Sequence, residues 1–195
     1  MFNQAVAFLI NNIAAFFIFN LVLRFLLQVV RAPFHHPLAQ FVLKLTNFIV
    51  LPLRKVVPSL GGYDTASLLA AWLIALVMNA LLLALDNLPV AWGSPSVMLV
   101  LGGLALVELL RLSLYLLFGA MLVQAILSWV NPHNPLSPLL DRLVNPVLNP
   151  LRKLIPPMNG LDLTPLFALL AIEMLQRFVI TSIVISLRTS LFVLG

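Results

Sequence analysis

The chain has 195 residues, of which 62% are apolar and 9% are charged, with a formal net charge of +5 and no cysteine. A soluble domain carries roughly 25% charged residues, so this composition excludes an ordinary water-soluble fold and makes lipid the expected solvent for much of the chain. The absence of cysteine excludes disulfides, thiolate metal sites and cysteine nucleophiles, and the lack of interleaved aromatic and basic residues argues against nucleic acid as a partner.

Four stretches reach the roughly 20 mostly apolar residues that a membrane-spanning helix needs. They cover residues 5–30, 66–85, 97–130 and 163–187. The first lacks the basic start and cleavage site of a signal peptide, so we expect it to be retained. The third is longer than a span requires, since one helix over it measures roughly 50 Å against a hydrocarbon core of about 30 Å. We expect a long protruding helix or a broken one; the alternative is a span over 112–130, with residues 97–111 at the membrane surface.

An internal repeat emerges without gaps when the sequence is shifted by 98 residues. The matching positions are Pro52-Leu53-Arg54-Lys55 with Pro150-Leu151-Arg152-Lys153, Asn47 with Asn145, Pro58 with Pro156, Gly62 with Gly160, and Asp64 with Asp162. An ordered series of this kind indicates a duplication, with repeats over residues 1–97 and 98–195. Because each repeat holds two spans, both have the same orientation and are related by a pseudo-two-fold axis along the membrane normal.

Between its two spans, each repeat carries the pattern of a basic amphipathic helix. Apolar residues recur at i, i+3, i+4 and i+7 over 38–49 and 136–148, with Lys44 and Arg142 at equivalent positions on the other face. Such a helix lies flat at the bilayer surface. Alternatively it packs on the end of the helix bundle, and both interpretations can hold. The predicted fold is therefore an all-α integral membrane protein in which each repeat is a membrane helix, an amphipathic interfacial helix with its PLRK loop, and a second membrane helix.

Prolines mark the predicted bounds of the two amphipathic helices. Pro37 and Pro135 suit the first helical position, with Asn134 as a good N-cap. Pro52 and Pro150 are expected to end the helices, because proline lacks an N–H donor and clashes with the preceding turn.

The cations of the two loops are the predicted site for lipid headgroups or a partner protein. They are Lys44, Arg54, Lys55, Arg142, Arg152 and Lys153. An alternative interpretation is that they serve only as a topology signal. The positive-inside rule places the loops 31–64 and 131–162 in the cytoplasm and both termini outside, because the short loop 86–96 has no Lys or Arg. Asp64 and Asp162 each precede an apolar helix and are expected to cap it.

Charged and polar residues inside the spans are candidates for function, because they are costly in lipid. They are Arg24, Asn79, Glu108, Arg111, Glu173 and Arg177. Glu108 with Arg111, and Glu173 with Arg177, are spaced so that each pair can neutralise itself, and Arg24 can extend its charged end to the interface. The alternative is a polar pathway that involves Glu108, Glu173 and Asn79.

No pattern in the sequence indicates catalysis. There is no phosphate loop, zinc motif or nucleophile motif, and we expect no enzyme activity, no cofactor and no metal site. His35 and His133 are equivalent in the two repeats and form a conceivable metal or haem pair, but their place at the start of proline-rich loops favours surface or capping roles.

The repeated motif resembles the YggT family. The second repeat carries it best, as Ser128-Trp129-Val130-Asn131-Pro132, Asn145-Pro146 and the PLRKLIP segment at 150–156. The first repeat departs from it, with Phe48 in place of the second proline and Val30-Arg31 in place of Ser128-Trp129. The resemblance covers nearly the whole chain.

The resemblance implies a multi-pass protein of the bacterial inner (cytoplasmic) membrane, from a family linked to osmotic or salt tolerance, with relatives linked to cell division, to nucleoid or plastid partitioning, or to haem attachment in a cytochrome b complex. It implies no catalytic residues. We expect a non-enzymatic membrane scaffold or assembly factor whose basic helices bind lipid headgroups or a partner membrane complex. The alternative is a component of ion or solute transport with a polar pathway between the repeats. The expected partners are membrane lipid and another membrane complex or a second copy of the chain, and not nucleic acid.

Overall fold

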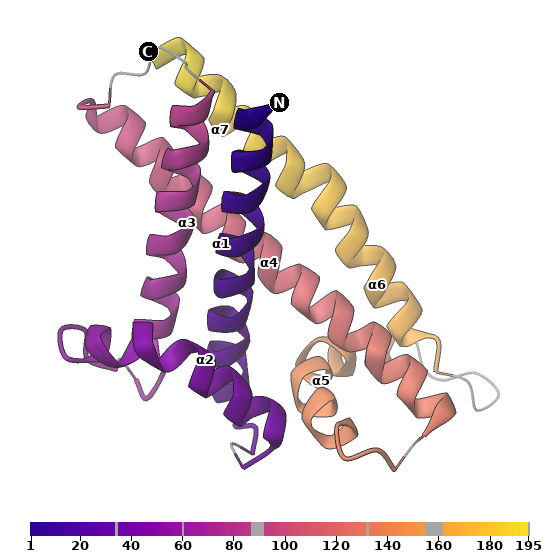
Figure 1. Ribbon diagram of the computed structural model, residues 1–195. Coiled ribbons are helices and arrows are strands. Elements are labelled where there is room, and N and C mark those ends of the chain that lie inside the picture. The colour runs from indigo at the N-terminus through magenta and orange to yellow at the C-terminus, as the bar shows by residue number, and fades with distance from the viewer. Residues whose placement is uncertain (34, 60, 87–91, 132, 155–161, 195) are drawn as a thin grey trace.

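The computed structural model describes the whole chain except residues 34, 60, 87–91, 132, 155–161 and 195, and every regular element of the described part is helical (Figure 1). The first repeat contains α1 (Phe2–Val29), α2 (Pro37–Arg54) and α3 (Thr65–Leu85). The second contains α4 (Pro95–Val130), α5 (Ser137–Leu154) and a final run made of α6 (Thr164–Met174), the π-helical turn η1 (Leu175–Ile180) and α7 (Thr181–Leu194). The predicted all-helical, two-repeat class is confirmed.

Four helical runs are long and apolar enough to cross a membrane. They are Phe2–Val29, Thr65–Leu85, Pro95–Ser128 and Thr164–Leu191. The first and third run away from the end that holds both termini, and the second and fourth return to it, so the two repeats share one orientation (Figure 1). The short helices α2 and α5 both lie at the opposite end from the termini. The predicted arrangement, with both basic loops on one side, is confirmed.

The long third stretch is one unbroken helix. α4 has 36 residues, about 54 Å at 1.5 Å per residue, and crosses the bundle obliquely (Figure 1). Residues 97–111 therefore belong to the same helix as the rest of the span, and the alternative of a separate surface segment is wrong. Gly102 does not break this helix. Because glycine has no side chain, the Trp72 indole can approach closely, and the Gly102 carbonyl accepts a hydrogen bond from Trp72 Nε1 at 3.1 Å.

The two amphipathic helices have bounds that differ from those predicted. α2 begins at Pro37 as predicted, and His36 Nδ1 accepts a hydrogen bond from the Leu38 N–H at its start. α5 begins at Ser137 and not at the predicted Pro135. Before it, the Asn134 side chain forms a local turn by accepting a hydrogen bond from the Leu136 N–H. The predicted ends at Pro52 and Pro150 are wrong, since α2 continues to Arg54 and α5 to Leu154.

The helices tolerate these prolines because of where they lie. A proline removes the hydrogen bond to the carbonyl four residues earlier. For Pro52 that carbonyl belongs to Phe48 and for Pro150 it belongs to Pro146, and all four residues are exposed. A carbonyl on an exposed face can accept from water instead.

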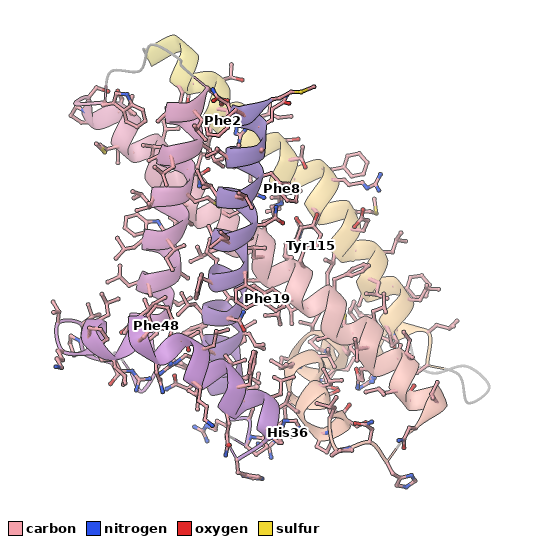
Figure 2. All side chains as sticks on the ribbon, in the orientation of Figure 1. Phe2, Phe8, Phe19, His36, Phe48 and Tyr115 are labelled. Atoms are coloured by element: carbon pink, nitrogen blue, oxygen red, sulfur yellow. The ribbon has the colours of Figure 1, made fainter. Side chains whose placement is uncertain are left out.

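Small residues allow the first two spans to pack closely. The buried face of α3 consists largely of Ala66, Ala70, Ala71 and Ala75, which pack against Ile18, Leu21 and Val22 of α1. Small side chains bring helix backbones near each other, which is the main source of association between helices in lipid. Large apolar side chains instead point outward, Phe8 and Phe19 of α1 among them (Figure 2).

The two repeats meet where α4 packs against α1 and α3, and also at the end that carries α2 and α5. Leu27 and Ala32 of the first repeat pack with Ala39 of α2 and with Leu139 and Leu143 of α5. The Arg142 guanidinium also donates to the Arg31 carbonyl, which lies just past the end of α1 where the chain takes a positive φ of 51°. The described parts of the two basic loops therefore meet in one continuous surface.

Candidate functional site

Asp64, the residue immediately before α3, is the centre of a buried ion-pair network. Arg24 of α1 donates from Nε to Asp64 Oδ2 at 3.1 Å, and the two side chains are only 3% and 2% exposed. Arg54, at the end of α2, donates from Nη2 to Oδ2 at 2.6 Å and from Nε to Oδ1 at 3.2 Å. One carboxylate therefore ties all three helices of the first repeat together.

Neutral side chains complete this network. Arg24 Nη1 donates to Thr46 Oγ1 at 2.8 Å and to Asn47 Oδ1 at 2.9 Å, and Ser67 Oγ donates to Asp64 Oδ2 at 2.7 Å. In the described part of the chain, no buried side-chain nitrogen or oxygen lacks a partner. A buried charge is tolerated when it is both paired and hydrogen-bonded, and the network meets both conditions.

Two predictions about these residues are wrong. Arg24 does not extend to the membrane surface, because its guanidinium finds its acceptors inside the protein, on Asp64, Thr46 and Asn47. The Asp64 carboxylate does not cap α3, because the two arginines and Ser67 occupy its oxygens. The Asp64 backbone carbonyl accepts from the Ser67 N–H instead, at 3.0 Å.

Thr46, Asn47 and Ser67 are partners of the ion pair that the sequence did not predict. A signal for Thr46 exists, since it is a polar residue four positions from both Val42 and Val50, which are buried on the same face of α2. Asn47 is marked only by its match with Asn145 in the repeat. Neither signal identifies Arg24 as the partner.

The electrostatic environment keeps Asp64 ionised. Burial by itself raises the pKa of this carboxyl group, but the hydrogen bonds from Arg54 and Ser67 and the charges of Arg54 and Arg24 outweigh it and lower the pKa below its ordinary value. With both arginines charged, the three side chains together carry one net positive charge.

The second repeat has an equivalent but exposed pair. Arg152 Nε donates to Asp162 Oδ2 at 2.9 Å, and both side chains are about one-third exposed, at 35% and 34%. Arg152 Nη1 also donates to Asn145 at 3.1 Å and to Asn149 at 3.2 Å. Asp162 Oδ1 accepts from the Thr164 backbone N–H at 2.9 Å, so this carboxylate does satisfy a free N–H group at the start of the following helix, as predicted.

Burial alone also raises the pKa of Asp162. Hydrogen bonds from Thr164, together with the hydrogen bond and charge of Arg152, outweigh that effect and lower the pKa. The repeated residues Pro156 and Gly160 lie outside the described part of the chain.

The six predicted cations divide into two groups. Arg54 and Arg152 hold the aspartates of their own repeats, and Arg142 joins the repeats through the Arg31 carbonyl. The other three are exposed and form no ion pair within the described ranges. They are Lys44, Lys55 and Lys153.

Large aromatic side chains accompany Lys44 on α2. Phe41 and Phe48 are 59% and 64% exposed, and with Lys44 they follow helical spacing along one open face (Figure 2 labels Phe48). The opposite face of α2 buries Val42, Thr46 and Val50 against the spans. α2 therefore packs on the end of the bundle with one face, as the second interpretation predicts. Phe41 and Phe48 share the open face with Lys44, whereas the pattern predicted them on the face opposite to it, and contact of this face with the bilayer stays a prediction.

The charged pairs inside the spans form as their spacing predicts. Arg111 lies 3.6 Å from Glu108, and Arg177 lies 2.7 Å from Glu173. Asn79 donates to the Ala75 carbonyl of its own helix at 2.8 Å. Among the described residues, no hydrogen bond joins Glu108, Glu173 and Asn79 to one another, so the polar-pathway hypothesis gains no support from their contacts.

Histidines do not form a joint site in the described residues. His35 and His133 are both exposed, and His36 accepts the Leu38 N–H at the start of α2. A search of the described chain finds no group of three or more His, Cys, Asp or Glu side chains placed to hold a metal ion.

Comparison with known proteins matches both halves of the chain to one family. The family model described as CCB3/YggT matches residues 3–85 and 103–183. A Pseudomonas aeruginosa protein named "Uncharacterized protein PA0392" is 37% identical over 183 residues, which is 93% of this chain and 91% of that protein. The Escherichia coli K12 protein named "Uncharacterized protein YggT" is 33% identical over 175 residues, which is 89% of this chain and 88% of that protein.

A more distant relative from Haemophilus influenzae is 30% identical over 82% of this chain and 83% of its own length, and is also named "Uncharacterized protein". None of these names refers to an enzyme. No solved structure matches the chain.

Proposed function

The chain belongs to the CCB3/YggT family, and on this premise we propose that it is a non-enzymatic membrane scaffold or assembly factor. Its four apolar helical runs make it a membrane protein. In this proposal, the end that carries α2 and α5 faces the cytoplasm of a bacterial inner membrane. There it binds anionic lipid headgroups and presents this surface to a partner membrane complex.

One observation carries the proposal, namely that α2 and α5 lie together at the end of the bundle opposite both termini (Figure 1). This end presents Lys44, Lys55 and Lys153 to the surroundings. Each basic residue near an anionic bilayer surface contributes about 1 kcal/mol of attraction, so three lysines on one continuous surface supply a substantial preference for anionic lipid.

The aromatic residues of α2 support contact with the bilayer itself. Phe41 and Phe48 are exposed beside Lys44, and aromatic rings with cationic neighbours are typical of helices that lie in the interface plane. α5 differs, because the residues that match Phe41 and Phe48 are Leu139, which is buried, and Pro146. In the proposal, α2 inserts into the interface while α5 contributes charge.

The paired arginines have a different role. Arg54 and Arg152 fix the turns that lead into α3 and α6 by holding Asp64 and Asp162. We therefore assign lipid contact to the three unpaired lysines and positioning of the basic surface to the two arginines. The family's links to osmotic tolerance and cell division remain hypotheses that rest on the resemblance alone.

The test is the lipid preference of the purified full chain. In native mass spectrometry from mixed micelles, the wild type should retain phosphatidylglycerol over phosphatidylcholine, and the triple variant Lys44→Gln/Lys55→Gln/Lys153→Gln should lose that preference by at least about tenfold, given about 1 kcal/mol per charge. The matched control replaces the same three lysines with arginine and should behave as wild type. An unchanged preference in the glutamine variant contradicts the proposal.

Two further measurements separate lipid binding from other effects. Because loop cations also set topology, a reporter fused to the C-terminus should show the same orientation in both triple variants. Affinity capture of the chain at native expression level then tests the assembly-factor half of the proposal. A stoichiometric membrane complex that is recovered with wild type and lost with the glutamine variant supports it.

A further inference from the structure

Four charged side chains form one patch near the middle of α4 and of the last span. The four are Glu108, Arg111, Glu173 and Arg177. Arg111 lies over the Tyr115 ring with its guanidinium carbon 5.9 Å from the ring centroid, and Tyr115 in turn interacts electrostatically with Arg177. Figure 2 shows Tyr115 where α4 runs beside the last span.

The patch lies near the centre of two helical runs that are long enough to cross a membrane. Arg111 is midway between the ends of the span Pro95–Ser128, and Arg177 is midway between the ends of Thr164–Leu191. At 1.5 Å per residue, each is roughly 20 Å or more along its helix from either end. A charged side chain at the bilayer centre costs about 2.5 to 3.5 kcal/mol on insertion scales.

Three of these side chains are nevertheless open on the outside of the bundle, whereas Glu108 is only 16% exposed. Arg177 is 74% exposed, and Arg111 and Glu173 are 45% and 40% exposed. The rim is apolar, with exposed Leu170, Met174 and Phe178 on the last span. Exposed ion pairs within an apolar rim are costly against lipid and suit a protein surface that covers them.

The local backbone is built to present this patch. The π-helical turn Leu175–Ile180 lies within it, and Gln176 on this turn donates to the Arg111 carbonyl of α4 at 2.9 Å. Thr181 Oγ1 accordingly donates to the Gln176 carbonyl, five residues earlier, at 2.9 Å. π-helical turns inside α-helices occur often at functional sites, and here the turn fixes the last span against α4 beside the charges.

The first repeat shows that the fold does not require these charges. A shift of 98 residues places Glu108 on Ile10, Arg111 on Ile13, Tyr115 on Phe17, Glu173 on Ala75 and Arg177 on Asn79. Ile10, Ile13 and Phe17 line an open apolar groove of about 610 Å³ between α1 and α3. The face of α1 that matches the charged face of α4 is thus apolar and open, whereas Ala75, which matches Glu173, is buried in the core.

We propose that the charged patch of the second repeat is the interface for a second copy of this chain. The two ion pairs contain two acids and two bases, so the patch is complementary to itself, while Arg188 adds a further positive charge that acts on Glu108. In a two-fold interface, each contact between two different residues occurs twice, once in each direction. Arg177 of each copy can therefore approach Glu173 of the other. The basic end of the bundle takes no part in this contact.

The test uses the absence of cysteine from the chain, which makes a single introduced thiol an unambiguous probe. Phe178→Cys lies on the rim of the patch, and Val77→Cys on α3 is a matched control on an exposed apolar face of the first repeat. Oxidation in native membranes should give a disulfide-linked homodimer with Phe178→Cys and at least about tenfold less with Val77→Cys. No homodimer, equal yields, or crosslinking only to a different protein overturns the proposal.

Charge reversal identifies the contact as the patch. In the Phe178→Cys background, Arg177→Glu alone and Glu173→Arg alone should each lower the dimer yield by about tenfold or more, because like charges then face each other. Coexpression of the two variants with different tags should restore the mixed dimer, which a misfolded chain cannot do. Unchanged yields in the single variants, or failure of the mixed dimer with both chains correctly inserted, overturns the assignment. The lysine variants of the proposed function should dimerise normally, so the two proposals fail independently.

Discussion

The two repeats use the same arginine and aspartate in different surroundings. In the first repeat, Arg54 and Asp64 share their site with buried Arg24. In the second, Arg152 and Asp162 form a single pair that is open to the surroundings. The repeated loop motif therefore specifies an arginine–aspartate contact that fixes the turn into the following span, and it does not specify burial.

Residues outside the motif decide that difference. The positions equivalent to Arg24, Thr46 and Ser67 hold Leu122, Val144 and Pro165 in the second repeat. The side chains of these three residues can form no hydrogen bond with the guanidinium or the carboxylate. Even the asparagine that is present in both repeats changes its partner, since Asn47 accepts a hydrogen bond from Arg24 whereas Asn145 accepts one from Arg152.

The comparison predicts its largest effect at the two aspartates. Asp64→Ala leaves the buried Arg24 without a counter-ion and should lower the free energy of unfolding by about 3 kcal/mol or more. Asp162→Ala removes an exposed pair and should cost about 1 kcal/mol or less. Reversible unfolding of the purified protein in mixed micelles, followed by circular dichroism, measures both. Equal losses would mean that burial does not distinguish the two sites.

A smaller effect is expected when the first repeat is made to resemble the second. Arg24→Leu leaves Asp64 paired with Arg54 but removes the hydrogen bond that Arg24 donates to buried Thr46. It should therefore lower the free energy of unfolding by about 1 to 3 kcal/mol. Adding Thr46→Val removes that polar group as well, and the double variant should recover part of the loss, because an apolar replacement of both partners can be nearly neutral. The same unfolding measurement compares the two. A double variant that is less stable than Arg24→Leu would contradict this account.

The smallest effect is a loss of stability in acid. The pKa values of Asp64 and Asp162 are both lowered by folding, so each carboxylate binds a proton less readily in the folded state than in the unfolded chain. Their contribution to stability is complete above the ordinary aspartate pKa of about 3.9 and is lost as the pH falls below it through the folded pKa. Unfolding midpoints between about pH 6 and pH 3 should therefore fall less for the variant Asp64→Asn/Asp162→Asn than for the wild type. Parallel curves would show that other groups control acid stability.

Hydrophobic length and the repeat predict most of the fold. The four spans, their common orientation and the two short helices at one end follow from apolar runs of spanning length and from a 98-residue shift without gaps. The self-pairing of Glu108 with Arg111 and of Glu173 with Arg177 also follows from sequence, because helical geometry fixes neighbours three and four residues apart.

Two local predictions fail for a reason that spacing cannot reveal. Pro52 and Pro150 do not end their helices, because the carbonyls that they leave unpaired lie on exposed faces. Arg24 does not reach the membrane surface, because Asp64 lies beside it in the folded chain although the two are separated by 40 residues in sequence. In each case the outcome depends on what surrounds the residue in three dimensions.

The sequence by itself determined the membrane class, the duplication, the orientation shared by the repeats and the pairing of charges on one helix, because all of these depend on composition, period or local helical spacing. Only the tertiary structure decided which cations form ion pairs within the described residues, that Asp64 is buried and Asp162 is not, and that Tyr115 of α4 joins charges from two spans into one patch. These features arise from contacts between helices, whose energy depends on burial and on the exact partners brought together by packing.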